Sequence, residues 1–189
     1  MPRAPRAETH KPTRTPGARN LPCGGLAAPG PFPMQIVDLL VPTRVLAEAR
    51  TTSKKRLLEQ LARALDERAT PESERAIFEA LCKRERLGST ALGGGVALPH
   101  GRSPDVTKPA GAFMRLSEPV SFDAPDGQPV DLVFGLVVPE HFTDQHLNLL
   151  AEIAQLFSLG GLTSALRRAR SASEIYELLC SWHEHPAAA

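Results

Sequence analysis

One stretch of the sequence, residues 85–101, holds the side chains best suited to chemistry. His100 follows Pro99 at the end of a strand predicted over residues 96–99, and Gly101 after it leaves room beside the ring for another molecule's backbone or a bulky anion. An imidazole with an ordinary pKa of about 6.5 is mostly neutral at pH 7 and keeps a lone pair for attack. These residues predict an exposed histidine nucleophile, for which a phosphoryl group is a suitable electrophile.

A loop rich in glycine and hydroxyl side chains precedes this histidine. Its backbone N–H groups and the hydroxyls of Ser89 and Thr90 could cradle phosphoryl oxygens. The loop is not a dinucleotide-binding G-x-G-x-x-G, because Leu98 stands at the last glycine position, and it is not a Walker A loop, because no Gly-Lys-Ser/Thr follows. Ser89 also lies outside the Gly-x-Ser-x-Gly pattern of a hydrolase nucleophile. Phosphate chemistry centred on the histidine remains as the interpretation.

A second histidine, His146, falls in the first turn of a helix predicted to begin at Thr143 and Asp144. Unpaired N–H groups and the helix dipole favour an anion there and disfavour protonation of the ring, which becomes a neutral donor to phosphate. Taken singly, His100 could be a ring hydrogen-bonded at a turn, and His146 a polar residue at a helix start. The two together favour a phosphoryl site, whereas Arg102 is interpreted as a solvated surface charge.

The spacing of apolar side chains and the turn residues predict the elements that position these groups. In chain order we predict a structured start over 34–41, a helix from Ser53 to about 67, a helix from Thr70 ending before Gly88, strands over 110–116 and 130–138, a helix from 143 stopped by Gly160 and Gly161, a helix over 162–169, and a helix from about Ser173 to Trp182. The later strand, apolar almost throughout, is expected at the centre of the sheet. The pattern indicates an α/β domain whose helices cover the sheet.

Composition divides the 189-residue chain near Met34. Residues 1–33 hold eight of the 18 prolines and five Lys+Arg against one acidic residue, which predicts a disordered tail. Two explanations for this tail stay open: a translation start assigned too far upstream, or a dispensable extension, and the mass of the natural N-terminus would decide. The remaining 156 residues carry 17 Lys+Arg and 20 Asp+Glu, a net charge of −3, so general binding to nucleic acid or anionic membranes is not expected.

The sequence offers little support for a membrane span, a disulfide framework or a metal site. No run of roughly 18 apolar residues occurs, so we expect a soluble protein and no integral membrane segment. The three cysteines are too few and too dispersed for disulfides or a paired-cysteine zinc site, which favours a reducing cytoplasm: Cys23, Cys82 and Cys180. The other histidines of the domain fit no zinc spacing, and no metal or cofactor is predicted: His141, His183 and His185.

The spacing of specified residues resembles an active-site signature. It runs from the acidic Glu85 through six residues to Leu92-Gly93, then two residues, then Val96-Ala-Leu-Pro-His-Gly101. This resembles the enzyme IIA proteins of the bacterial phosphotransferase system (PTS), in the fructose, mannitol and nitrogen-regulatory class, and every specified position matches. The segments 83–90, 122–132 and 143–147 look like the nitrogen-regulatory members. The resemblance spans residues 34–185, expected as one PTS EIIA type-2 domain, with 1–33 and 186–189 as tails.

The resemblance implies a fold and a set of site residues. The fold is the mannitol-type IIA fold, an α/β mixed β-sheet flanked by helices on both faces. His100 is then the residue that accepts a phosphoryl group from the histidine of a small phosphocarrier protein (HPr/NPr-like), and His146 is the second histidine contacting that group. Supporting roles fall to a further set of residues: Arg84, Ser89, Thr90 and Gly101.

Three functions remain open at this stage. The first is a stand-alone phosphoryl carrier that regulates partners, such as kinases or potassium transporters, according to its phosphorylation state. The second is a fructose- or mannitol-specific IIA component that passes phosphate to a IIB protein. The third is a non-catalytic binding module that keeps the fold and uses the groove around His100 only for docking. The segments around both histidines favour the regulator.

Overall fold

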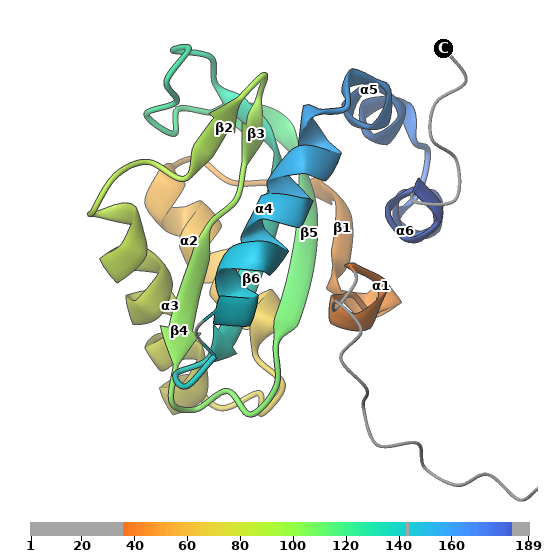
Figure 1. Ribbon diagram of the computed structural model, residues 1–189. Helices are drawn as coiled ribbons and strands as arrows, with labels where there is room; N and C mark the ends of the chain where they lie inside the picture. The colour runs from red at the N-terminus through yellow and green to blue at the C-terminus, as the bar shows by residue number, and fades with distance from the viewer. Residues whose placement is uncertain (1–35, 143, 183–189) are drawn as a thin grey trace, which may run out of the picture. The chain divides into compact units, whose positions relative to one another are not determined.

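Six strands form one mixed sheet in the computed structural model, which describes residues 36–142 and 144–182 (Figure 1). The elements in chain order are α1 (Ile36–Leu39), a 3-10 turn η1 (Pro42–Arg44), β1 (Val45–Ala49), α2 (Lys54–Leu65), α3 (Pro71–Glu85), β2 (Ala91–Gly93), β3 (Val96–Ala97), β4 (His100–Ser103), β5 (Ala110–Val120), β6 (Val130–Pro139), α4 (Asp144–Ser158), α5 (Gly160–Arg168) and α6 (Ala172–Ser181). The predicted tails, Thr143, Cys23, His183 and His185 lie outside the described residues.

The strand β6 is the centre of the sheet, as its continuous apolar sequence predicts. The strand order is β1-β5-β6-β3-β2, with β4 also pairing β6. β5 runs antiparallel to β6, and β3 and β4 pair parallel to β6 one after the other, at Leu132 and then at Leu136. Residues 98 and 99 separate the two short strands, and the Pro99 carbonyl accepts from the Leu136 N–H at 2.9 Å. This interrupted pairing presents His100 at the start of β4.

Helices cover both faces of the sheet, so the predicted fold class is confirmed (Figure 1). Successive side chains of β6 alternate between two apolar cores. Phe134 and Leu136 pack in the core formed with α4, α5 and α6, whereas Val133 and Val137 pack in the core formed with α2 and α3. Gly135 lets α2 approach closely, because a Cβ there would lie 2.5–2.6 Å from the side-chain carbons of Leu61.

The helix starts predicted at Ser53 and Thr70 are confirmed. Ser53 caps α2 by accepting the Arg56 N–H at its hydroxyl, and Thr70 caps α3 by accepting the Ser73 N–H. Pro71 follows Thr70 in the first turn of α3, where its missing N–H leaves no bond unmade. These local contacts fix where α2 and α3 begin, and α3 lies against β4 through the close approach of Ala80 to Gly101.

Several boundaries differ from the prediction. The strand expected over 96–99 stops at Ala97, and His100 begins β4 instead of following a strand end. Gly160 and Gly161 do not merely stop α4, which ends at Ser158, since they form the first turn of α5. The structured start predicted over 34–41 contains the four-residue helix α1. β1, β2 and β4 were not predicted, and β5 runs beyond 116 to Val120. These short strands exist through pairing with distant partners, which local sequence patterns do not encode.

No single helix among the described residues is long and apolar enough to cross a membrane. Residues 146–158 of α4 and 161–168 of α5 reach the length and apolar composition of a membrane span only when taken together. The two segments are bent by 75° at the break between them. Five of their apolar side chains are buried in the core against the sheet: Leu149, Ile153, Leu156, Leu162 and Leu166.

Candidate active site

The imidazole of His100 is held in one orientation at the start of β4. Its backbone pairs with Leu136 of β6, and its Nδ1 lies 2.8 Å from the carbonyl oxygen of Leu98. Because a carbonyl oxygen only accepts, Nδ1 carries the proton and Nε2 carries the lone pair. The ring is half-buried. The fold therefore fixes the tautomer of the ring and leaves Nε2 as its lone-pair nitrogen.

Arg84, in the last turn of α3, contacts this lone pair. Its Nε donates to Nε2 of His100 at 3.0 Å, and its Nη1 donates to the carbonyl oxygen of Gly88 at 3.0 Å. Burial lowers the pKa of His100 below its ordinary value, the Leu98 carbonyl opposes that effect, and the cations Arg84 and Arg102 lower it further. The ring is therefore neutral at pH 7.

His146 is the third residue of α4, and its ring lies close to that of His100. The two ring centroids are 5.5 Å apart, with the planes tilted by 57°. His146 is buried, and no hydrogen-bond partner for its Nδ1 is found within the described part of the chain. Burial, followed by the charges of His100 and Arg102, lowers the pKa of His146 to about 4. Neutrality of this ring was expected from the helix dipole, whereas desolvation is its main cause.

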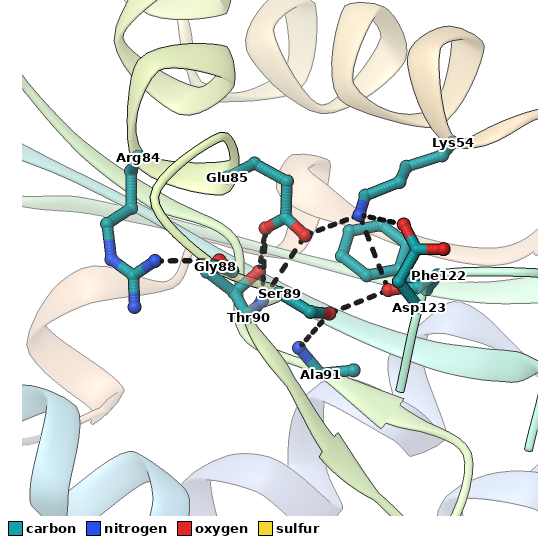
Figure 2. A network of polar contacts seen from close by, with 9 residues as sticks. All are labelled: Lys54, Arg84, Glu85, Gly88, Ser89, Thr90, Ala91, Phe122 and Asp123. Carbon is teal, nitrogen blue, oxygen red and sulfur yellow. Dashed lines mark hydrogen bonds and ion pairs between the residues drawn. The ribbon is translucent and has the colours of Figure 1, made fainter. Parts of the chain in front are cut away.

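Ser89 and Thr90 are near the site, but their hydroxyls are engaged elsewhere (Figure 2). Ser89 Oγ donates to the Phe122 carbonyl at 2.6 Å and accepts the Ala91 N–H at 3.2 Å. Thr90 Oγ1 donates to the carboxylate of Glu85. The structure therefore brings Arg84 and His146 to His100, whereas these two hydroxyls shape the loop that precedes it.

Gly101 serves helix packing. A Cβ at this position would lie 2.9 Å from the carbonyl carbon of Ala80 and 3.0 Å from its Cβ, on α3. The expectation that Gly101 leaves open space for another molecule is wrong, because α3 fills that space. The missing side chain lets β4 lie against α3, which carries Arg84.

An ion pair behind the site was missed by the sequence reasoning. Lys54, the first residue of α2, places its Nζ 2.6 Å from Oε1 of Glu85. The Glu85 side chain is only 6% exposed. The acidic position in the signature was the available signal for Glu85, while nothing local marked Lys54.

The described residues contain no group of three or more His, Cys, Asp or Glu side chains arranged to hold a metal ion. The site consists instead of two neutral imidazoles and the cations of Arg84 and Arg102. A nucleophilic nitrogen beside fixed positive charge suits attack on an anionic phosphoryl group. The fold and the site together define an α/β protein with a paired-histidine site whose charges suit an anionic group.

Comparison with known proteins identifies the family. Residues 38–182 match the family model described as "Phosphoenolpyruvate-dependent sugar phosphotransferase system, EIIA 2". A nitrogen regulatory protein of Bradyrhizobium diazoefficiens is 46% identical over 146 residues, which cover 77% of this chain and 95% of that protein. The chain belongs to the EIIA type-2 family of the phosphotransferase system, as the signature predicted.

Solved structures agree with this assignment. Nitrogen regulatory protein IIA-Ntr from Neisseria meningitidis superposes with a TM-score of 0.72 at 44% identity, covering 76% of this chain and 98% of that one. The mannitol IIA protein of Escherichia coli, at 23% identity and a TM-score of 0.62, shows the same fold over 74% of this chain and 98% of its own. The protein is a IIA-Ntr-like regulatory component of the phosphotransferase system, and the predictions of family, fold and regulatory function are confirmed.

Proposed function

We propose that the protein is a phosphohistidine carrier, with His100 Nε2 as the atom that accepts a phosphoryl group from a phosphocarrier protein. One observation carries the proposal: Nε2 of a ring locked by the Leu98 carbonyl faces Arg84 and lies beside the buried ring of His146. The donor is a small HPr/NPr-like protein with its own phosphohistidine. The family's place in the phosphotransferase system supports this choice of donor.

The transfer balances without a further reactant. The Nε2 lone pair attacks phosphorus in line with the donor's P–N bond, which breaks and returns its electron pair to the donor imidazole. The new N–P bond places positive charge on the His100 ring, and the Leu98 carbonyl stabilises that charge through the Nδ1 proton. The protein's contribution is positioning and electrostatic stabilisation.

Arg84 must release Nε2 before the attack, because its hydrogen bond occupies the lone pair. An incoming phosphoryl group offers the guanidinium anionic oxygens, which are stronger acceptors than a neutral imidazole. Neutral His146 can donate from a protonated Nδ1 that otherwise lacks a partner among the described residues. Arg84 and His146 then hold the transferred group from two sides.

Exposed leucines beside the site suit a protein donor. Leu87 is 82% exposed and precedes Gly88, whose carbonyl holds Arg84, and Leu147 is 64% exposed and follows His146. Large exposed apolar side chains around a reactive group are typical of a docking surface for another protein.

Regulation follows from the charge that the transferred group adds. A phosphoryl group changes the local charge by about −1.5 to −2, enough to recruit or eject a partner at this surface. Regulated partners such as kinases or potassium transporters fit this role, and the similarity to nitrogen regulatory proteins favours it. Onward transfer to a IIB protein and docking without phosphorylation are the competing outcomes.

Labelling tests the carrier activity. Incubation with phosphoenolpyruvate, enzyme I and the phosphocarrier should add one acid-labile phosphoryl group to the wild type and none to His100→Ala. His141→Ala, which changes an exposed histidine, is the matched control and should label fully. An unlabelled wild type would overturn the proposal, and full labelling of His100→Ala would overturn the site. Affinity capture with phosphorylated and unphosphorylated protein then tests the switch, which identical partner sets would contradict.

A further inference from the structure

We propose that Lys54 and Glu85 are positioning residues of the transfer site: their ion pair holds the loop 86–90 so that the Gly88 carbonyl aims Arg84 at His100. The role of the pair in transfer rests on the proposed function of His100. Figure 2 draws no hydrogen bond or ion pair between Arg84 and either Lys54 or Glu85, so the pair acts on Arg84 through the loop.

Glu85 ties the loop back to the end of α3. It is the last residue of that helix, directly after Arg84, and its carboxylate accepts the Thr90 N–H at 3.1 and 3.2 Å. The same carboxylate accepts the Thr90 hydroxyl. One buried side chain therefore closes the turn that contains Gly88.

Lys54 joins this closed turn to a second loop. As the first residue of α2, it contacts Glu85 at 2.6 Å and Asp123 Oδ2 at 2.9 Å, and its Nζ lies 4.5 Å from the centroid of the Phe122 ring. The Phe122 carbonyl accepts from Lys54 at 3.4 Å and from the Ser89 hydroxyl at 2.6 Å. The loop is thus held at Ser89 by the Phe122 carbonyl and at Thr90 by Glu85. Lys54 contacts both of these partners (Figure 2).

The position of Gly88 decides where Arg84 points. With Nη1 bound to the Gly88 carbonyl at 3.0 Å, the guanidinium is fixed at one end and its Nε reaches His100 Nε2. Removing the Lys54 charge leaves the buried Glu85 carboxylate without its cation, a state that is strongly unfavourable. The carboxylate then moves toward water, releases Thr90 and displaces Gly88.

Other ion pairs of the same helices make matched controls. Lys55 follows Lys54 but is 75% exposed and lies 3.8 Å from Glu59. Glu79, on α3 like Glu85, is 61% exposed and pairs with Arg75. Such surface pairs contribute little. Lys54→Met is therefore compared with Lys55→Met, and Glu85→Gln with Glu79→Gln.

The experiment measures the phosphoryl-transfer rate from the phosphocarrier and the ¹⁵N resonances of Arg84 Nε and His100 Nε2 in the unphosphorylated full chain. Lys54→Met should slow transfer by about 10- to 100-fold, the range expected for a displaced positioning group, and should shift the Arg84 Nε resonance. Glu85→Gln, which keeps an acceptor for Thr90, should change both readouts in the same direction by less. Lys54→Arg should restore them, and both controls should match the wild type.

Every result of these measurements either supports or overturns the inference. The inference would be overturned if Lys54→Met and Glu85→Gln keep unchanged resonances and transfer rates within about twofold of their controls. A twofold difference corresponds to about 0.4 kcal/mol. If Lys54→Met does not fold, Glu85→Gln and Lys54→Arg still decide it. If the wild type is never labelled, the proposed function fails, while the resonance shift still tests whether the pair positions Arg84.

Discussion

The Nε of Arg84 donates a hydrogen bond of 3.0 Å to the Nε2 of His100, the atom proposed as the nucleophile. The contact both lowers the pKa of His100 and occupies its lone pair. It therefore favours the neutral ring. Under the proposed function, the lone pair becomes available when an anionic phosphoryl group draws the guanidinium away.

Replacing Arg84 with Met should separate these two effects. The pKa of His100 should rise, because the positive charge of Arg84 that lowers it is gone. Burial still lowers the pKa in the variant. Phosphoryl transfer should fall by about 100-fold, the usual cost of losing one donor to the reacting group. An NMR titration of the ring and a labelling time course measure the two quantities. Arg86→Met, at an exposed cation two residues away, is the control, and an unmoved His100 pKa would contradict the electrostatic role.

His146 should make stability depend on pH. Its pKa is about 4 in the folded protein, against about 6.5 when unfolded, so the unfolded chain binds a proton first as the pH falls. This contribution to stability is complete above pH 6.5 and is lost progressively toward pH 4, amounting to about 2 kcal/mol between pH 7 and pH 5. Urea unfolding of the wild type and of His146→Gln at both pH values isolates it. If stability depends on pH equally in the two proteins, the lowered pKa of His146 is refuted.

Local signals account for what was predicted correctly. Ser53 and Thr70 cap helices through contacts three residues away, and the apolar run of β6 requires a buried central strand. The strand β4 was missed because His100 pairs with Leu136, on a strand that follows much later in the chain. Lys54 was missed for the same reason, since its bonds to residues 122 and 123 span 68 and 69 positions. The helix predicted from Ser53 gives no sign of these contacts, which only the tertiary fold creates.

Gly101 offers a test of packing alone. Gly101→Ala places a Cβ 2.9 Å from the Ala80 carbonyl carbon, so α3 or β4 must shift. The free energy of unfolding should fall by about 1–3 kcal/mol, as for other overpacked sites. In contrast, a Cβ at Gly161 lies at an ordinary 3.4 Å from the Trp182 ring, within a helix. Gly161→Ala should be neutral or stabilising by up to about 1 kcal/mol. Equal stability of the two variants in urea would contradict the packing role.

The exposed leucine beside Arg84 should contribute to docking and not to the fold. Leu87→Ser removes an 82% exposed side chain, so stability should change by no more than about 0.5 kcal/mol. The KM for the phosphocarrier should rise about fivefold or more, since an apolar anchor at an interface contributes over 1 kcal/mol, and kcat should stay near the wild-type value because Arg84 and His100 are untouched. Leu159→Ser is the control, because Leu159 is 48% exposed and directly follows the end of α4 that is far from His146. Thirteen residues separate Leu159 from His146, which at the helical rise per residue corresponds to about 20 Å. A KM that rises equally in both variants would show general loss of function, and an unchanged KM in Leu87→Ser would place the docking surface elsewhere.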